Sequence, residues 1–391
     1  MKLTFIVALS VSLMLAISPA GASAADLTPV EELGKLLFFD TNLSSPAGQA
    51  CADCHAPEAG WTASESELNQ VEGIYHGAIE KRFGNRKAPS SAYADAPVLA
   101  LDEITGRWHG GTFWDGRATG LTLGDPLAEQ AMGPFLNPVE QHIPHAKQVI
   151  LKVRKSAYAA LFEQVWGKGS LDAVNDVEGT YVKIARSIAA YERSAEVNPF
   201  DSKYDYWLKG EVDLTAQEEL GRQLFNANGC NICHTSAPGP EDEPPLFTNF
   251  GYANIGFPRN ENNPFYTQPK KVNPDGADWV DYGLGGFLAA AGFEPAVYEP
   301  QLGKHKVPTL RNIDKRPAPD FVKAYGHNGV FKSLEEVVHF YNTRDVEDWP
   351  TPEVPMNVVG MPFAGDLGLT ADEETAIVAF LKTLSDGYVA D

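Results

Sequence analysis

Basic residues and long apolar runs are both scarce in this sequence. Lys plus Arg number 31 against 52 for Asp plus Glu, which gives a formal net charge of −21. Because so acidic a surface repels phosphate backbones and anionic lipids, it argues against nucleic acid and membrane surfaces as partners, and it would attract a basic redox protein. No stretch beyond the amino terminus approaches about 18 apolar residues, so membrane insertion is not expected.

Long polar tracts are absent as well. Hydrophobic residues make up 43% and charged residues 21% of the 391 positions. This composition is that of a globular chain and excludes bulk disorder or a collagenous stalk. At roughly 150 residues per domain, the length predicts two or three domains.

The amino terminus has the pattern of a secretory signal. Lys2 precedes an apolar run over residues 5–17, and Ala22-Ser23-Ala24 supplies the small residues of a cleavage site. We therefore expect residues 1–24 to be a signal peptide that is removed on export, and we expect the mature protein to be periplasmic.

The four cysteines fall into two CxxCH units with none left over. The units are Cys51-Ala52-Asp53-Cys54-His55 and Cys230-Asn231-Ile232-Cys233-His234. In each unit, the two thiols can form thioethers to one haem and the next histidine can ligate its iron. A zinc site would lack a fourth ligand, and a thioredoxin-like pair needs no histidine in both copies. The spacing predicts two covalently bound haem c groups.

A repeat accompanies these motifs. Residues 32–38 (ELGKLLF) and 219–225 (ELGRQLF) match at five of seven positions, with a Lys/Arg exchange at a sixth. The repeat predicts two tandem cytochrome c-like domains, over residues 25–197 and 198–391. In each copy, an amphipathic helix would cover the haem, and the glycine would permit close approach of a second element.

Helical periodicity is the main secondary-structure signal. It recurs over residues 181–189, Thr215 is a candidate helix cap, and Thr370-Ala371-Asp372-Glu373 has the pattern of a capping box. A Pro/Gly/Asn-rich segment over residues 238–300 predicts loops that wrap the second haem. Because no convincing strand alternation is present, the predicted fold is mainly α with long loops.

Three further blocks surround the haem motifs in a characteristic order. They are Phe113-Trp114-Asp115-Gly116-Arg117, Gln130-Ala131-Met132-Gly133-Pro134 and Lys306-Val307-Pro308-Thr309-Leu310-Arg311-Asn312. With the two CxxCH units, they resemble the bacterial dihaem cytochrome c peroxidase and MauG family over essentially the whole mature chain. The resemblance implies an oxidoreductase that uses hydrogen peroxide, with its haems near the domain interface, and it allows a homodimer.

The resemblance also implies roles for single residues. His55 would be the proximal ligand of the peroxide-binding haem, and His234 would serve the second, electron-handling haem. Glu140 lies six residues after Pro134, which matches the family's spacing between a pocket proline and a distal carboxylate. A carboxylate there can take the peroxide proton and return it to the leaving oxygen. Trp114 matches the tryptophan that lies between the two haems.

Three polar residues are weaker candidates for contact with the cofactors. Gln130 and Arg117 would hydrogen-bond or pair with haem groups, and Arg311 would pair with a propionate.

The sixth ligand of the second haem is where this chain departs from cytochrome-fed peroxidases. Those proteins carry a methionine fourteen residues after a His-x-Gly element, whereas counting from His327-Asn328-Gly329 reaches Tyr341 here, as in the MauG group. A phenolate lowers the potential of iron and favours its oxidised states, whereas a thioether raises the potential. Met356 and Met361 remain alternatives from a following loop.

A histidine loop raises the question of activation. Ile74-Tyr75-His76-Gly77 resembles the loop whose histidine blocks the first haem in reductively activated members. His76 is therefore either a resting-state iron ligand or an exposed loop residue. A low-potential second haem would be difficult to reduce for such activation, so the two features conflict.

The calcium ion expected between the domains is also in question. The family has Asn before Ala/Ser-Pro, but Asn85-Arg86-Lys87-Ala88-Pro89 places Lys87 at that ligand position. Because an ammonium cannot ligate calcium, either Lys87 replaces the charge of the ion or Asn85 serves as the ligand.

Three functions remain open from the sequence. The first is a periplasmic dihaem peroxidase that works through a high-valent haem pair, with a small cytochrome c or a copper protein as donor. The second is a MauG-like oxidase of Trp or Tyr side chains in a partner protein, although Asn228 stands where MauG has its electron-relaying tryptophan. The third is a non-catalytic dihaem electron carrier or sensor.

Overall fold

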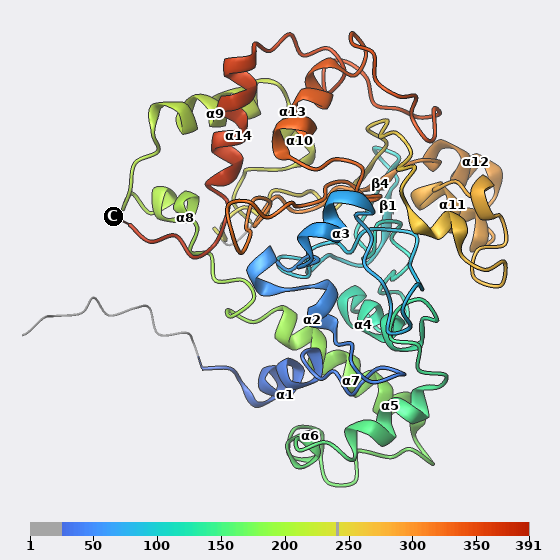
Figure 1. Cartoon of the computed structure of the whole chain (residues 1–391). Coiled ribbons are helices and arrows are strands. Elements are labelled where there is room, and N and C mark those ends of the chain that lie inside the picture. The colour runs from blue at the N-terminus through green and yellow to red at the C-terminus, as the bar shows by residue number, and fades with distance from the viewer. Residues whose placement is uncertain (1–25, 240–241, 391) are drawn as a thin grey trace, which may run out of the picture.

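The computed structural model describes residues 26–239 and 242–390, so the predicted signal peptide over residues 1–24 lies outside it. The described residues form a mainly helical fold, as predicted (Figure 1). Its helices in chain order are α1 (Pro29–Phe38), α2 (Cys51–Cys54), α3 (Ser66–Val71), α4 (Pro126–Leu136), α5 (Ala146–Val153), α6 (Ala159–Trp166), α7 (Val177–Glu192), α8 (Lys203–Leu208), α9 (Ala216–Ala227), α10 (Cys230–Cys233), α11 (Gly283–Ala290), α12 (Pro295–Tyr298), α13 (Leu334–Thr343) and α14 (Ala371–Lys382).

Strands are few and short. β1 (Ala100–Asp102) pairs antiparallel with β2 (Arg107–His109), and β3 (Tyr252–Ala253) pairs antiparallel with β4 (His305–Lys306). The second pair joins two distant segments of the chain and brings His305 and Lys306 to the centre of the molecule.

The two copies of the sequence repeat use their glycines in the same way. A Cβ at Gly34 in α1 would lie 1.9 Å from the carbonyl oxygen of Ser187 in α7. A Cβ at Gly221 in α9 would lie 1.8 Å from the carbonyl oxygen of Ala376 in α14. Only a residue without a side chain permits these close helix crossings, so each glycine pairs its helix with the last long helix of its half.

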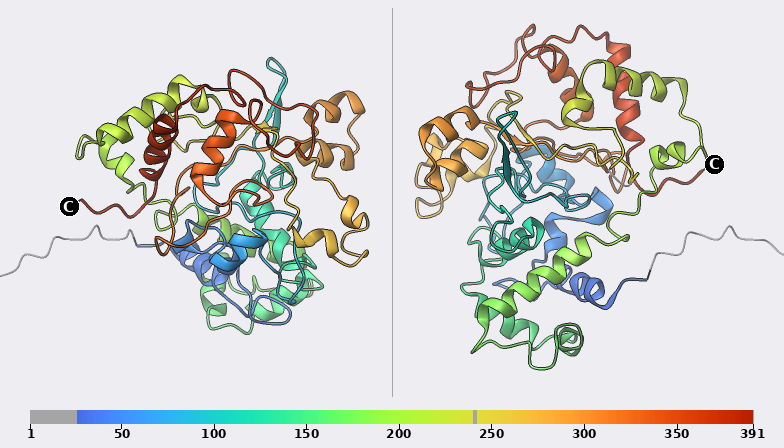
Figure 2. Two further views of the ribbon diagram at one scale, coloured as in Figure 1. Left: turned by 45° about the horizontal axis from the view of Figure 1, so that its top comes forward. Right: turned by 180° about the vertical axis from the view of Figure 1, so that it is seen from behind.

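Two large apolar cores form around these helix pairs. The buried residues of the first core run from Leu33 to Val197, and those of the second run from Tyr204 to Leu384. In Figures 1 and 2, α1 and α4 to α7 lie at one end of the molecule and α9, α13 and α14 at the other. The predicted division at residues 197 and 198 remains a prediction.

Local signals account for several helix ends. The hydroxyl of Thr215 accepts the backbone N–H of Glu218, and the carboxylate of Glu218 accepts the backbone N–H of Thr215 at 2.7 Å. Thr370 and Glu373 make the same reciprocal pair at the start of α14. These capping boxes bond backbone donors that the first turn of a helix leaves without partners.

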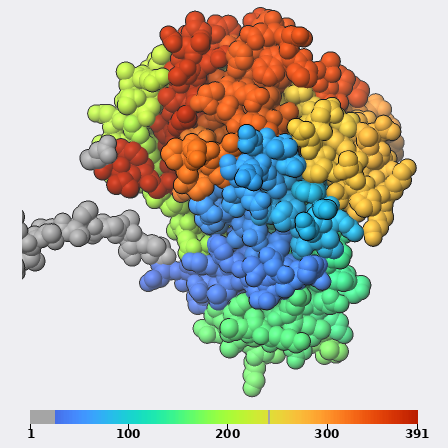
Figure 3. Space-filling view, viewed as in Figure 1, coloured from blue at the N-terminus to red at the C-terminus, as the bar shows by residue number. Residues whose placement is uncertain are grey.

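The segment over residues 238–300 is more ordered than its composition suggests. It contains β3, α11 and α12 among its turns. Five of its residues line the cavity that also holds the second CxxCH unit: Ala253, Asn254, Ile255, Phe257 and Asp281. The space-filling view shows this segment at one side of the molecule, against both the N-terminal and the C-terminal parts (Figure 3).

The helices of the described residues are all too short or too polar to span a bilayer.

Candidate haem centres

The second CxxCH unit opens into a large apolar cavity. Cys230, Cys233 and His234 line it together with Tyr341 of α13, which approaches from a different part of the chain. The carbonyl oxygen of Phe247 lies 3.0 Å from His234 Nδ1, so the neutral ring donates there and leaves Nε2 free. Burial lowers the pKa of His234 to about 4. A neutral imidazole of fixed orientation is what iron ligation requires.

The first CxxCH unit is arranged in the same way. His55 lines a smaller cavity with Gln130, and its Nδ1 lies 3.3 Å from the carbonyl oxygen of Trp61. Burial lowers the pKa of His55 to about 4 as well. In both units, one helical turn spans the two cysteines, and all four cysteines are free thiols.

The two cavities meet at a shared wall. Trp114, Lys306, Val307 and Pro308 line both of them. The Trp114 indole N–H donates to the carbonyl oxygen of Lys87 at 2.7 Å, and the backbone N–H of Lys306 donates to the carbonyl oxygen of Trp114 at 2.8 Å. These bonds hold Trp114 in the wall that the two cavities share.

Glu140 lies close to the first CxxCH unit, although it does not line the cavity. Its charge contributes, after burial, to the raised pKa of both Cys51 and Cys54. Burial raises the pKa of Glu140 itself, and this effect is opposed by the charge of Arg117 and by a hydrogen bond from Asn137 Nδ2 at 2.8 Å. A buried carboxyl group with a raised pKa holds a proton more readily than an exposed one, which suits a group that takes up and returns a proton.

Two other residues predicted near the first haem, Pro134 and Arg117, differ in what they contact. Pro134 lies inside α4, and its carbonyl oxygen accepts the backbone N–H of Gln141, which fixes the turn that carries Glu140. Arg117 lies over the ring of Phe113, 3.8 Å from its centroid, and pairs with Asp115 at 3.0 Å.

His76 lies outside both cavities. Its side chain is 37% exposed, its Nδ1 lies 2.9 Å from the carbonyl oxygen of Gly77, and its ring stacks on Tyr75. The loop is nevertheless tied to the distal region, because the backbone N–H of Ala78 donates to the carbonyl oxygen of Glu140 at 2.8 Å. In this conformation, His76 does not face the first cavity.

The three candidates for the sixth ligand of the second haem differ in whether they line the second cavity. Tyr341 lines the second cavity, where burial raises its pKa. Met356 and Met361 are 49% and 61% exposed and do not line it. Tyr341 is therefore the one of the three that faces the second CxxCH unit.

Arg311 lies apart from the lining of both cavities. Its guanidinium is buried among aromatic rings and pairs with Asp205 at 2.7 Å, and its Nε donates to the carbonyl oxygen of Pro245. Asp205 thus balances the charge of Arg311 within the protein. Through Asp205 and Pro245, Arg311 connects α8 with the loop that follows α10.

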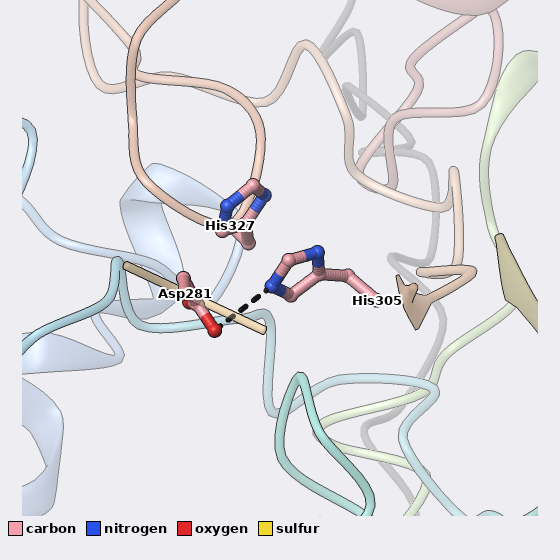
Figure 4. Close-up of side chains that lie close together, drawn as sticks. All are labelled: Asp281, His305 and His327. Carbon is pink, nitrogen blue, oxygen red and sulfur yellow. Dashed lines mark ion pairs between the residues drawn. The ribbon is translucent and has the colours of Figure 1, made fainter. Parts of the chain in front are cut away.

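A polar network borders the shared wall. Arg86 makes a bidentate pair with Asp281 at 2.6 Å and a second pair with Asp115 at 2.6 Å. Asp281 Oδ1 also lies 3.2 Å from Nε2 of His305, whose ring stacks on that of His327 with centroids 3.5 Å apart (Figure 4). Although burial opposes it, the charges of Arg86 and His305 hold the pKa of Asp281 well below its usual range.

The three side chains in Figure 4 have the spacing of a metal site but not its geometry. Ligand atoms of Asp281, His305 and His327 lie within 4.8 Å of one another. The two imidazole rings are stacked with planes that differ by only 11°, so their ring-nitrogen lone pairs lie in two separate, nearly parallel planes and do not converge on one ion. Asp281 is also already neutralised by Arg86. The buried charges of Arg86, Asp115 and Asp281 therefore balance one another, and the three side chains do not form a metal site.

Sequence reasoning missed a second buried cation, near Lys87. The ammonium of Lys323 donates to the carbonyl oxygens of Ala59 and Asn312 at 2.9 Å and of Lys315 at 3.0 Å. Burial, followed by the charge of Lys87, lowers the pKa of Lys323, whereas three carbonyl acceptors match the three N–H groups of the charged form. Lys323 thus joins the two halves of the chain with an ammonium.

The residues of both cavities fit a covalently held haem. The second cavity is lined by Cys230, Cys233 and His234, whereas His55 alone of the first unit lines the first cavity, with Cys51 and Cys54 on the helical turn just before it. Both histidines are neutral and held by a backbone carbonyl oxygen, and both cavities have a mainly apolar wall. Arg86, Asp281 and Lys323 had no local signal in the sequence, since their partners lie far away along the chain.

Comparisons with known proteins agree with this geometry. The family model described as di-haem cytochrome c peroxidase matches residues 29–213. The chain is 36% identical over 385 residues to the methylamine utilization protein MauG of Paracoccus denitrificans, covering 94% of this chain and 92% of that protein. It is 28% identical over 372 residues to the cytochrome c551 peroxidase of Nitrosomonas europaea, covering 94% and 84%.

Solved structures show the same likeness. The dihaem peroxidase BthA from Burkholderia thailandensis superposes with a TM-score of 0.76 at 29% identity, covering 95% of this chain and 89% of that one. A MauG-like protein associated with microbial copper homeostasis gives 0.63 at 25% identity, covering 97% and 96%. The chain belongs to the dihaem cytochrome c peroxidase and MauG family. It is an oxidoreductase of the peroxidase type, with haem as its cofactor.

Proposed function

We propose that this protein is a periplasmic dihaem c-type peroxidase in which electrons reach peroxide from the second centre through Trp114. The observation that carries the proposal is the position of Trp114, which lines both cavities. The two haems, bound through Cys51, Cys54, Cys230 and Cys233, would supply the redox-active iron.

The residues of the chain would hold and protonate the reactants. His55 and His234 would present Nε2 to iron, each held by a backbone carbonyl, and Tyr341 would complete the second centre. Glu140 would take a proton from peroxide and return it to the leaving oxygen. Asn137 holds the Glu140 carboxylate through a 2.8 Å hydrogen bond while this proton moves.

Stopped-flow absorption and EPR of the fully oxidised protein with one equivalent of peroxide would test the proposal. Because His76 lies outside the first cavity, we expect both ferric signals to change at once, without prior reduction. If nothing reacts until an electron is supplied, His76 moves in to block the first centre, and the protein is reductively activated.

Substitution of Glu140 tests the catalytic assignment. Glu140→Gln should slow peroxide consumption about 100-fold or more, as expected for a general acid-base group, whereas the exposed Glu178→Gln should not. A parent protein that does not react with peroxide, with no change in Glu140→Gln, would favour the non-catalytic electron carrier or sensor.

The reductant has two candidate classes. The acidic chain favours a basic cytochrome c or copper protein, whereas the 36% identity to MauG favours an aromatic side chain of a partner protein. Turnover with each candidate, followed by peptide mass analysis, separates them. Oxidised Trp or Tyr in the partner supports the MauG-like oxidase, and turnover that leaves the partner unmodified supports the peroxidase.

A further inference from the structure

An aromatic cluster runs from the first CxxCH unit to the surface. We define it as Phe38, Phe39, Trp61 and Tyr191. Phe38 lies 6.5 Å from His55, and Trp61, whose carbonyl oxygen faces His55 Nδ1, lies 6.1 Å from Tyr191. Tyr191 lies 6.2 Å from Phe39, which is 39% exposed. Rings at these centroid distances are in direct aromatic contact.

Tyr191 has a proton acceptor in place. The residue is fully buried, and its phenol donates to Glu196 Oε1 at 2.9 Å. Glu196 is partly exposed and is itself paired with Lys35 at 2.8 Å. Burial and the neighbouring carboxylate raise the pKa of Tyr191, so the phenol keeps its proton at rest. A phenol that can pass its proton to a bonded carboxylate is easier to oxidise than one without such an acceptor.

A surface hollow opens beside the outer end of this cluster. Its lining combines rings and aliphatic groups with charges of both signs: Glu32, Lys35, Leu36, Phe39, Asp40, Asn42, Lys155, Ser156, Ala157 and Tyr158. The rings of Phe39 and Tyr158 can pack against a flat aromatic molecule, and the lysines and carboxylates of the lining can bond the hydroxyl of a phenol. The hollow touches the cluster at Phe39 and touches Glu196 through Lys35.

We propose that Tyr191 is a redox-active residue that passes electrons from a small phenol bound in the surface hollow, through Trp61, towards His55. This activity rests on the proposed peroxidase function, because peroxide is the oxidant. It adds a second class of reductant, and an entry route separate from the second centre.

The step balances with peroxide as the electron acceptor. Tyr191 gives one electron to Trp61 and its phenolic proton to Glu196. A phenol in the hollow then returns one electron to Tyr191, Glu196 returns the proton, and the phenol releases its own proton and becomes a phenoxyl radical. Conversion of one peroxide to two waters takes up two electrons and two protons, so two phenols are oxidised for each peroxide.

Guaiacol is the probe for the test, with reduced cytochrome c as the comparison donor. Tyr191→Phe should lower the guaiacol rate about tenfold or more relative to the cytochrome c rate. Freeze-quench EPR after peroxide, without any donor, should show a tyrosyl radical in the parent protein and lose it in Tyr191→Phe. The buried Tyr266→Phe lies away from the cluster and serves as the matched control.

A second variant tests the hollow itself. Phe39→Ala should raise the KM for guaiacol severalfold and leave the tyrosyl signal in place. The inference is wrong if Tyr191→Phe keeps both the parent ratio of the guaiacol rate to the cytochrome c rate and the tyrosyl radical. That result would leave the proposed peroxidase function in place. If the parent protein consumes no peroxide with either donor, both proposals fail.

Discussion

The Trp114 indole and the carbonyl oxygen of Lys87 form a 2.7 Å hydrogen bond that fixes the ring between the two candidate haem cavities. Lys87 is buried, and its backbone N–H in turn donates to the carbonyl oxygen of His327 at 2.8 Å. Through its bond to Lys87, the orientation of Trp114 depends on residues 85–89, where the resemblance places a calcium ligand. The ring that joins the two centres is therefore held by the interface between the halves of the chain.

Trp114→Phe should slow communication between the two centres. The smaller ring has no N–H, so it loses the bond to Lys87 and leaves a gap in the shared wall. We expect oxidation of reduced cytochrome c by peroxide to slow about tenfold or more, measured at saturating peroxide. Trp108→Phe is the matched control, because Trp108 is equally buried but lines neither cavity. Equal losses in the two variants would mean that the effect is structural.

Tyr341→Met should raise the reduction potential of the second haem. A thioether favours ferrous iron, whereas a phenolate favours ferric iron. Spectroelectrochemical titration of the holoprotein measures this potential. Met356→Leu and Met361→Leu should leave it unchanged, since both methionines are exposed. A shift in a methionine variant with none in Tyr341→Met would mean that the loop supplies the ligand.

Lys323→Met should destabilise the protein. The substitution removes three hydrogen bonds and leaves three inward-facing carbonyl oxygens without a donor, which costs about 3 kcal/mol in the free energy of unfolding. Chelators should leave the parent protein unaffected, because Lys87 stands at the position of a calcium ligand and an ammonium cannot ligate that ion. Denaturant unfolding with and without EDTA measures both effects, and the exposed Lys168→Met is the control. A loss of stability on chelation would show that calcium binds after all.

Asp386 should make stability fall as pH rises. Burial raises the pKa of Asp386 to about 6, against 3.8 normally, while Tyr93 and Asn312 donate hydrogen bonds to it. Between these values, the unfolded chain has released a proton that the folded chain still holds, so the free energy of unfolding falls with pH by about 3 kcal/mol. Below pH 3.8 the difference vanishes.

Asp386→Asn should remove this pH dependence. The measurement is guanidinium unfolding across the range from pH 4 to pH 7, with the exposed Asp213→Asn as control. If the parent protein and Asp386→Asn keep parallel profiles, another group is responsible for the slope.

Local sequence predicted what depends on short spacing. The CxxCH units, the capping boxes at Thr215 and Thr370 and the glycines of the repeat act over a few residues, and the structure has each of them in place. The roles given to Trp114 and Tyr341 come from the family resemblance and stay predictions, although both side chains line a cavity. Most of the other residues that line the two cavities had no signal in the local sequence.

The remainder depends on contacts between distant segments. Arg86 and Asp281 are 195 residues apart, and Lys323 reaches a carbonyl oxygen 264 residues away, so no local pattern predicts either contact. Arg311 resembled a propionate partner, but its buried carboxylate partner Asp205 lies 106 positions earlier in the chain. The irregular composition of residues 238–300 likewise concealed α11 and α12, because the packing of α11 on α12 and on β4 outweighs weak propensity.

Lys323 also changes what assembly of the protein depends on. A dissociable ion occupies its site according to its concentration, so the fraction of properly joined molecules would vary with the surroundings. An ammonium that is part of the polypeptide is present in every copy from synthesis onward, in fixed stoichiometry and with no exchange. The three hydrogen bonds of Lys323 to the two halves are therefore available as soon as the chain folds.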